Sequence, residues 1–214
     1  MKNIKKITFA MILAMFLAGV FLYPTMPDTM ASHWGADGQV NGYIPKFEAL
    51  FLMPAITMAI FLLLILLPKI DPKRINYAGF QKYYDGFLAV FVGFMVYIHI
   101  LTSLFNRGFE FNMTAAIMPA MAVLFYSVGA LLERSRQNWF VGIRTPWTLS
   151  SEKVWDKTNR LGAKIFKTVA VLSLAMIFMG EPGFIVFVVM IVALSVYLVA
   201  YSYLEFKKEA GAKK

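Results

Sequence analysis

The chain has 214 residues, of which 59% are hydrophobic and only 15% are charged, and its mean hydropathy is +0.64. A soluble globular domain rarely exceeds about half apolar residues, so this much apolar surface requires lipid. The chain contains no cysteine, which excludes disulfides, thiolate metal sites and cysteine nucleophiles.

Six stretches are apolar enough to span a membrane, for which a helix needs roughly 20 mostly apolar residues. In chain order they are residues 7–23, 49–67, 86–105, 113–132, 165–180 and 183–204. Pro68 is predicted to end the second stretch, and the fifth is short and carries Lys167. The first is predicted to be a retained anchor, because no small-x-small cleavage site precedes Pro24.

The basic residues are distributed very unevenly between the two predicted faces of the membrane. Nineteen of the 21 Lys and Arg residues fall on the face that carries both termini, and only Lys46 and Arg107 fall on the other. Cytoplasmic loops are rich in Lys and Arg, so both termini are predicted to be cytoplasmic. This asymmetry accounts for the net charge of +9, so we expect membrane lipids as partners and no direct nucleic-acid binding.

These observations predict an all-α fold, a polytopic bundle of about six transmembrane helices in the cell membrane. The long loop before the fifth span contains NWFVGIRTPWTLSSEKVWDKTNRLG, residues 138–162, with three of the four tryptophans. Pro146 stiffens a turn that is predicted to hold Arg144 between Phe140 and Trp147. A guanidinium held between aromatic rings can stack and still bind a carboxylate or a phosphate.

The second part of this loop is predicted to form an amphipathic helix. Ser150 or Ser151 is a suitable N-cap, with Glu152 in the first turn. Val154, Thr158, Leu161 and Ile165 then share one face at helical spacing. We expect this helix to lie along the inner membrane surface and to bend at Gly162 into the fifth span. Both an interfacial anchor and a recognition surface for a lipid headgroup or a protein partner fit this pattern.

The spacing of residues in this loop resembles a known family signature. The matching residues are Asn138, Gly142 to Leu149, Glu152, Val154, Trp155, Lys157, Thr158 and Arg160 to Gly162. This pattern resembles the SdpI-type immunity proteins, multi-pass membrane proteins associated with resistance to a secreted peptide toxin, and the resemblance extends from about Pro119 to about Glu205. It implies the following inner-face residues for partner or lipid recognition: Asn138, Gly142, Arg144, Thr145, Pro146, Trp147, Trp155 and Arg160.

The outer loop and the second span resemble a domain of unknown function that is often found at the amino-terminal end of these proteins. The residues that carry this second resemblance are His33, Trp34, Asp37, Gly38, Gly42, Tyr43 and Lys46. Three regions are therefore predicted: residues 1–70 with the outer loop, residues 71–112 with the third span, and the SdpI-like residues 113–214.

The outer loop reads HWGADGQVNGYIPK from His33 to Lys46. Asp37-Gly38 and Asn41-Gly42 are turn dipeptides of the hairpin type. His33 and Asp37 are too few for a metal site, so no metal and no cofactor is expected. The candidate outer-face residues, which a toxin arriving from outside would meet, are His33, Trp34, Asp37, Gly38 and Lys46.

His99 is a strongly polar residue well inside the third span. Intramembrane ionisable residues are functional candidates. A neutral histidine that shares a hydrogen bond with Ser103, Tyr97 or Tyr126 is the commoner arrangement.

Three functions remain open from the sequence. The first is an immunity-like membrane protein that confers resistance to a secreted membrane-active peptide, possible partners being the peptide outside and a regulator inside. The second is a signalling protein that sequesters a cytoplasmic transcriptional regulator on the inner loop. The third is a lipid-handling transporter or enzyme, but enzymatic activity is not expected, because catalytic motifs and paired intramembrane carboxylates are missing from the sequence.

Overall fold

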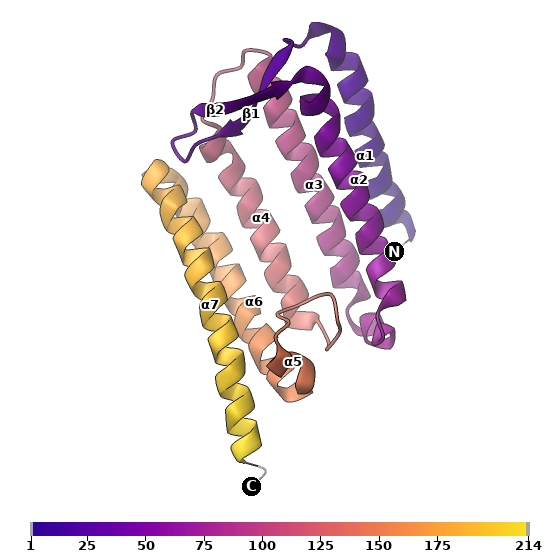
Figure 1. Ribbon diagram of the computed structural model, residues 1–214, viewed down its shortest axis with the longest axis vertical. Helices are drawn as coiled ribbons and strands as arrows, with labels where there is room; N and C mark the ends of the chain where they lie inside the picture. The colour runs from indigo at the N-terminus through magenta and orange to yellow at the C-terminus, as the bar shows by residue number, and fades with distance from the viewer. Residues whose placement is uncertain (1, 213–214) are drawn as a thin grey trace.

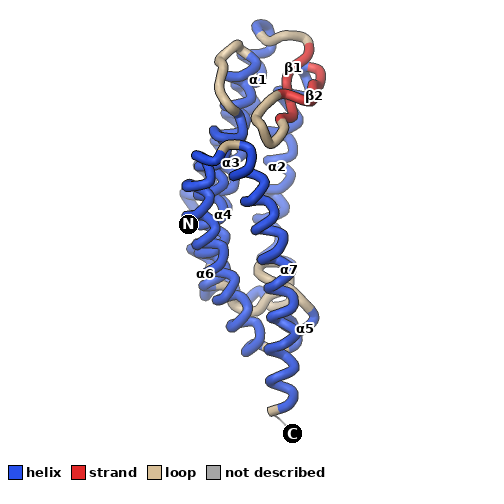
Figure 2. The backbone as a smooth tube through the Cα atoms, turned by 90° about the vertical axis from the view of Figure 1, so that its left-hand side faces the viewer, coloured by secondary structure: helices blue, strands red, loops and turns tan. Residues whose placement is uncertain are grey.

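The computed structural model describes residues 2–212 as a helical bundle with a small β-hairpin at one end (Figures 1 and 2). The elements, in chain order, are α1 (Lys2–Leu22), η1 (Tyr23–Thr25), β1 (Thr29–Trp34), β2 (Val40–Pro45), α2 (Lys46–Ile70), η2 (Arg74–Gly79), α3 (Gln81–Asn106), α4 (Met113–Arg134), α5 (Pro146–Ser150), α6 (Glu152–Met176), η3 (Ile177–Met179) and α7 (Glu181–Gly211).

All six predicted spans are helical, and the chain is a polytopic helical membrane protein. Among the described residues, α1, α2, α3, α4, α6 and α7 are each long and apolar enough to cross a membrane. Successive long helices run in alternating directions (Figure 1). The prediction that Pro68 ends the second span was wrong, because α2 continues to Ile70 with Pro54 and Pro68 inside it.

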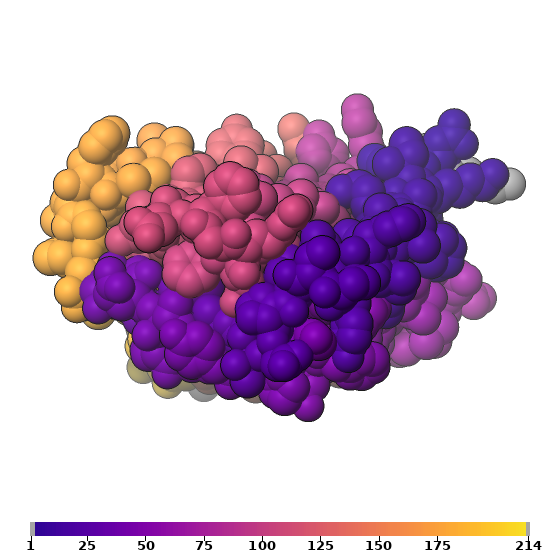
Figure 3. Space-filling model, turned by 90° about the horizontal axis from the view of Figure 1, so that it is seen from above, coloured from indigo at the N-terminus to yellow at the C-terminus, as the bar shows by residue number. Residues whose placement is uncertain are grey.

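The helices pack in chain order across the bundle. Helix α3 contacts α1, α2 and α4, whereas α6 contacts α4 and α7. One apolar core joins α1, α2 and α3 around Ile12, Phe61 and Val92, and a second joins α4, α6 and α7 around Met118 and Phe187. Seen from the hairpin end, the carboxy-terminal helices and the amino-terminal residues therefore lie at opposite edges (Figure 3).

Helices α4 and α6 approach each other closely at Gly129. A Cβ atom added to Gly129 would lie 2.9 Å from the carbonyl oxygen of Ala163 and 2.8 Å from Cγ of Lys167. Small residues allow membrane helices to pack backbone against backbone, since lipid leaves no hydrophobic driving force between them. This contact fixes α6, and with it the loop that precedes α6.

Helix α6 corrects one detail of the predicted fold. The amphipathic segment and the fifth span form one continuous helix, with Ser151 as N-cap and with no interruption at Gly162. The predicted faces are present, since Val154 and Thr158 are buried and Lys153 and Asp156 are exposed. Instead of an interfacial helix lying along the membrane, the amphipathic segment is the inner end of the span.

The outer loop folds into an antiparallel hairpin that is tied to the bundle. Met30 pairs with Ile44, and the ladder has an irregularity between Ala31 and Trp34. The Asn106 side chain at the end of α3 accepts a hydrogen bond from Ala31 N (2.7 Å) and donates one to Ala31 O (3.0 Å). Asn106 thus pairs with β1 as a neighbouring strand would, which positions the hairpin over the ends of the helices.

Candidate functional site

The loop between α4 and α5, residues 135–145, folds back against the bundle; we call it the inner loop, and the end of the bundle that carries it the inner end. Asn138 lies at its centre and is fully buried. Its Oδ1 accepts hydrogen bonds from Phe140 N (2.9 Å) and Val141 N (2.6 Å), and its Nδ2 donates to the carbonyl oxygens of Arg136 and Val141. Asn138 therefore replaces the backbone pairing that a helix or a strand would supply to this loop.

Two residues from the amino-terminal half complete this network. Asp71, just after α2, is 2% exposed, and its carboxylate accepts hydrogen bonds from Trp139 N (2.9 Å), Lys73 N (2.7 Å) and the hydroxyl of Tyr77 (3.2 Å). The same hydroxyl lies 3.2 Å from Asn138 Oδ1. Burial, followed by the negative charge of Asp71, raises the pKa of Tyr77, so the hydroxyl stays protonated and can donate.

The turn around Pro146 is held from both sides. Thr145 caps α5 in a capping box with Thr148, and Pro146 occupies the first turn of α5. The Thr145 hydroxyl lies 3.0 Å from the hydroxyl of Ser202 on α7. The stiff turn predicted around Pro146 is therefore present, and it joins the inner loop to the last helix.

Gly142 of the inner loop packs against Trp155 of α6. Gly142 has a φ of 126°, and a Cβ atom there would lie 2.9 Å from both Trp155 and Asn159. Asn159 Oδ1 accepts a hydrogen bond from Ile143 N (2.9 Å), while Trp155 Nε1 donates to Ser135 O (3.2 Å). Only glycine fits both the backbone conformation and the space at position 142.

The remaining predicted inner residues are more accessible. Arg144 is exposed and donates from Nη1 to Trp139 O (2.7 Å). The cation–ring contacts found among the described residues involve Lys46, Arg134 and Lys167, so the predicted place of Arg144 between two aromatic rings is not seen. Trp147 instead packs against Tyr203 of α7, with 5.1 Å between ring centroids. Pro146 is exposed, as is Arg160, which faces Asp156 at 3.8 Å.

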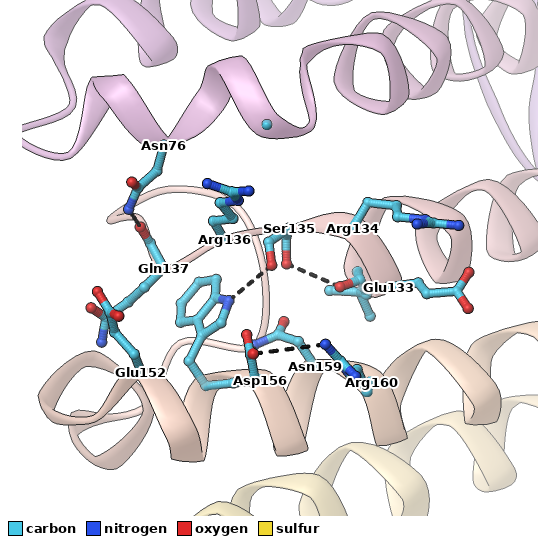
Figure 4. Close-up of a pocket in the computed structure, with 13 residues that line it drawn as sticks. Asn76, Glu133, Arg134, Ser135, Arg136, Gln137, Glu152, Asp156, Asn159 and Arg160 are labelled. Atoms are coloured by element: carbon cyan, nitrogen blue, oxygen red, sulfur yellow. Dashed lines mark hydrogen bonds and ion pairs between the residues drawn. The ribbon is translucent and has the colours of Figure 1, made fainter.

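A cavity of about 540 Å³ opens beside the network (Figure 4). Its floor includes the buried Trp155 and Asn159, and its walls come from η2, the end of α4 and the start of α6. Its charged lining residues are Glu133, Arg134, Arg136, Glu152, Asp156 and Arg160. The inner end thus combines a buried hydrogen-bonded network with an open, charged cavity.

The predicted outer residues lie together at the opposite end, in or next to the hairpin. The ring Nδ1 of His33 bonds to Asn41 Oδ1, the Trp34 ring packs edge-on against Phe105, and Lys46 forms an ion pair with Asp28 at 2.8 Å. Side-chain hydrogen bonding with Lys46 lowers the pKa of the Asp28 carboxyl. Within residues 2–212, no group of three or more His, Cys, Asp and Glu could hold a metal ion.

Of the two turns predicted in the outer loop, the structure contains one. Asp37 and Gly38 form the hairpin turn, where Gly38 has a φ of 80° and Asp37 accepts a hydrogen bond from Gln39 N (3.0 Å). Asn41 and Gly42 lie inside β2, so the prediction of a second turn was wrong. The start of α4 holds this turn, because Nδ2 of its N-cap residue Asn112 donates a hydrogen bond to Asp37 O (2.9 Å).

His99 lies inside α3, away from both ends, and is 4% exposed. None of its three predicted partners bonds to it: the hydroxyl of Tyr97 donates to Ala116 O (3.0 Å). Among the described residues, His99 Nε2 is one of four buried side-chain atoms without a hydrogen-bond partner. The structure therefore separates His99, the hairpin residues and the inner network, and the three do not form one site.

Several residues of the inner network were not found from the sequence: Asp71, Tyr77, Gln137, Thr148, Asn159 and Ser202. Only two of these carried a sequence signal, since Thr148 lies inside the family-like stretch and Asp71 precedes a proline at the end of a span.

Comparisons with known proteins match two regions of the chain. Residues 134–202 match the SdpI/YfhL protein family, and residues 10–58 match a domain of unknown function, DUF1648. Immunity protein SdpI of Bacillus subtilis (strain 168) is 24% identical over 216 residues, covering 99% of each chain. No solved structure matches.

The two matched regions contain the inner loop with α5, α6 and most of α7, and α1 with the hairpin and the first half of α2. The two matched regions and the alignment with the relative agree with one another, and together they show that this multi-pass membrane protein is similar to the SdpI-type immunity proteins along its length.

Proposed function

We propose that this protein confers resistance to a secreted membrane-active peptide on the cell that carries it. The observation that supports this most directly is the similarity to Immunity protein SdpI, which extends over 99% of both chains. A relative that matches only one region would share a module, whereas this alignment also includes the residues that form the hairpin and the inner loop here.

In this proposal both termini and the inner loop face the cytoplasm, and the hairpin faces outward. The distribution of Lys and Arg supports this orientation. The outer residues His33, Trp34, Asp37, Gly38 and Lys46 then form the surface that a peptide from outside meets first. The hairpin suits this role because Asn106 and Asn112 fix it to the bundle, so little conformational entropy is lost on binding.

The inner residues divide into two roles. Four of them hold the loop in one conformation. The polar atoms of Asn138, Thr145 and Trp155 form hydrogen bonds within the protein, and Gly142 packs so closely against α6 that no side chain fits there. Arg144, Pro146 and Arg160 are exposed and are free to contact a lipid headgroup or a protein, with Trp147 beside them on α5.

A survival experiment tests the proposal and the role of the exposed face. A peptide-sensitive strain expresses the chain, Arg144→Ala, or the matched control Arg74→Ala, which removes another exposed arginine at the inner end. We expect the wild type and Arg74→Ala to protect equally and Arg144→Ala to protect less. If no form protects although all reach the membrane, the proposed function is wrong.

A second candidate is signalling, in which the inner loop sequesters a cytoplasmic regulator. One observation favours it: Arg144 is fixed by the carbonyl of Trp139, whose own ring is 49% exposed, so an aromatic and a cationic side chain are presented together. Tryptophan and arginine are among the residues that most often carry the binding energy of protein interfaces. Capture of a regulator by the wild type, lost in Arg144→Ala and in Trp147→Ala, would support it; unchanged capture would exclude the loop.

A further inference from the structure

The cavity at the inner end has opposite charges on facing walls that are not paired with each other. Arg134 and Arg136 come from the end of α4 and the residues after it, and Glu152 and Asp156 come from the first turns of α6 (Figure 4). Within residues 2–212, neither Arg136 nor Glu152 forms an ion pair, and Asp156 pairs only with Arg160 on its own helix.

The two arginines are positioned by contacts that leave their charges uncompensated. Gly79 of η2 allows the Arg136 side chain to lie close, since a Cβ atom on Gly79 would be 2.7 Å from Arg136 Nε. The guanidinium of Arg134 lies over the ring of Tyr83, 5.5 Å from its centroid. The remaining acidic residue near them, Glu133, is paired with Lys167 at 2.6 Å. This side of the cavity therefore carries uncompensated positive charge.

We propose that this cavity binds a compound that carries a phosphate and a primary ammonium group, as a phosphoethanolamine headgroup does. The arginine fork matches phosphate oxygens, and the carboxylates of Glu152 and Asp156 accept hydrogen bonds from the ammonium group. A volume of about 540 Å³ is sufficient for such a group.

The position of the cavity favours a lipid as the source of this headgroup. Helix α4 reaches the end of its span at Arg134, and the exposed Trp139 ring lies just beyond it, as is typical of the membrane interface. The cavity therefore opens at the depth of the inner headgroups. A cytosolic phosphoammonium compound has the same chemistry and is distinguished by experiment. The inference does not depend on the proposed resistance function.

Native mass spectrometry of the delipidated full-length protein tests this inference. Phosphatidylethanolamine, phosphatidylglycerol and soluble glycerophosphoethanolamine are titrated separately, because the second lacks the ammonium group and the third lacks acyl chains. Arg136→Gln should weaken phosphatidylethanolamine and phosphatidylglycerol alike, by about tenfold. Glu152→Gln should weaken phosphatidylethanolamine by about tenfold and leave phosphatidylglycerol unchanged.

Matched controls are Arg74→Gln and Glu110→Gln, which remove exposed charges that do not line the cavity. All four variants replace exposed side chains, and unchanged thermal midpoints verify that they fold. Binding of glycerophosphoethanolamine with the same dependence on Arg136 and Glu152 supports the site and assigns its ligand to the cytosol. The inference is overturned if both lipids bind equally, if Glu152→Gln weakens both, or if the controls have the same effect as the cavity variants.

Discussion

The carboxylate of Asp71 tests whether the two halves of the protein are joined at the inner end. It accepts three hydrogen bonds, one from Trp139 N in the inner loop and two from its own segment, Lys73 N and Tyr77 Oη. Asp71→Asn keeps the size of the side chain but replaces one acceptor oxygen by an NH₂ donor. The amide oxygen can serve Trp139 and Tyr77 only if the NH₂ group faces the Lys73 N–H.

The expected cost follows from the bonds that are lost. One buried hydrogen bond to a charged acceptor contributes about 1.5 kcal/mol. Asp71→Asn loses one such bond and leaves Trp139 N with a neutral acceptor, so it should destabilise the junction with the inner loop by about 1.5 kcal/mol. Asp71→Ala removes all three acceptor contacts and should cost about 4.5 kcal/mol. Since 1.4 kcal/mol corresponds to a factor of ten, local opening should increase roughly tenfold in the first variant and roughly a thousandfold in the second.

Trypsin cleavage after Arg144 measures this opening, because Arg144 is exposed and lies in the inner loop. In the proposed orientation the loop is cytoplasmic, so inside-out vesicles expose it to the protease, and the fragments are identified by mass. Asp37→Asn is the control, since its carboxylate accepts a hydrogen bond from Gln39 N at the opposite end and should not affect the loop. If Asp71→Asn and Asp71→Ala are cleaved after Arg144 at the wild-type rate, Asp71 does not hold the loop.

Three further predictions concern the rest of the bundle. Asn106→Ala should release β1 at a cost of about 2 kcal/mol, seen as faster hydrogen exchange of the Ala31 amide, and unchanged exchange would contradict the docking role. Gly129→Ala should lower the thermal midpoint in detergent, because the added Cβ atom would meet Ala163 and Lys167. The control is Gly86→Ala in α3, which has open space around it and should keep or raise the midpoint. Equal midpoints for the two variants would argue against close packing of α4 and α6. His99→Leu should keep or raise the midpoint, because it removes a buried ring nitrogen without a partner, and a large loss of stability would show an undetected bond.

The spans were predictable because each depends on local composition. Twenty apolar residues must become a helix in lipid, where every backbone amide needs an internal partner. Pro68 was misjudged for a non-local reason: its missing N–H would leave the carbonyl oxygen of Leu64 without a partner, but the hydroxyl of Tyr84 on α3 donates to that oxygen (2.6 Å), and α2 continues to Ile70.

The sequence singled out Gly162 correctly as a position that needs glycine, but for the wrong reason. The sequence suggested a bend, but the helix is continuous, and a Cβ atom at Gly162 would lie 2.3 Å from Cδ1 of Ile143. The glycine makes room for the folded-back inner loop. That loop contact is non-local, so the spacing of the residues contains no sign of it.

The inner network could be predicted only in part for the same reason. Asn138, Gly142, Thr145 and Trp155 lie within one family-like stretch, whereas Asp71 reaches Trp139 across 68 positions of the chain. The network also crosses the predicted boundary between residues 71–112 and 113–214, so these regions meet at the inner end. Likewise, the predicted partners of His99 could not be tested from the sequence, because the rotation of α3 directs the Tyr97 hydroxyl to Ala116 O of α4 and leaves His99 Nε2 without a partner.

The proposed resistance function is tested most directly by peptide-induced depolarisation of living cells. Sensitive cells expressing the wild-type chain and cells carrying the empty vector are challenged with secreted membrane-active peptides while a potential-sensitive dye is followed. We predict that at least one peptide depolarises the vector cells and leaves the expressing cells polarised. Equal depolarisation by every peptide, with the chain present in the membrane, would contradict the proposal.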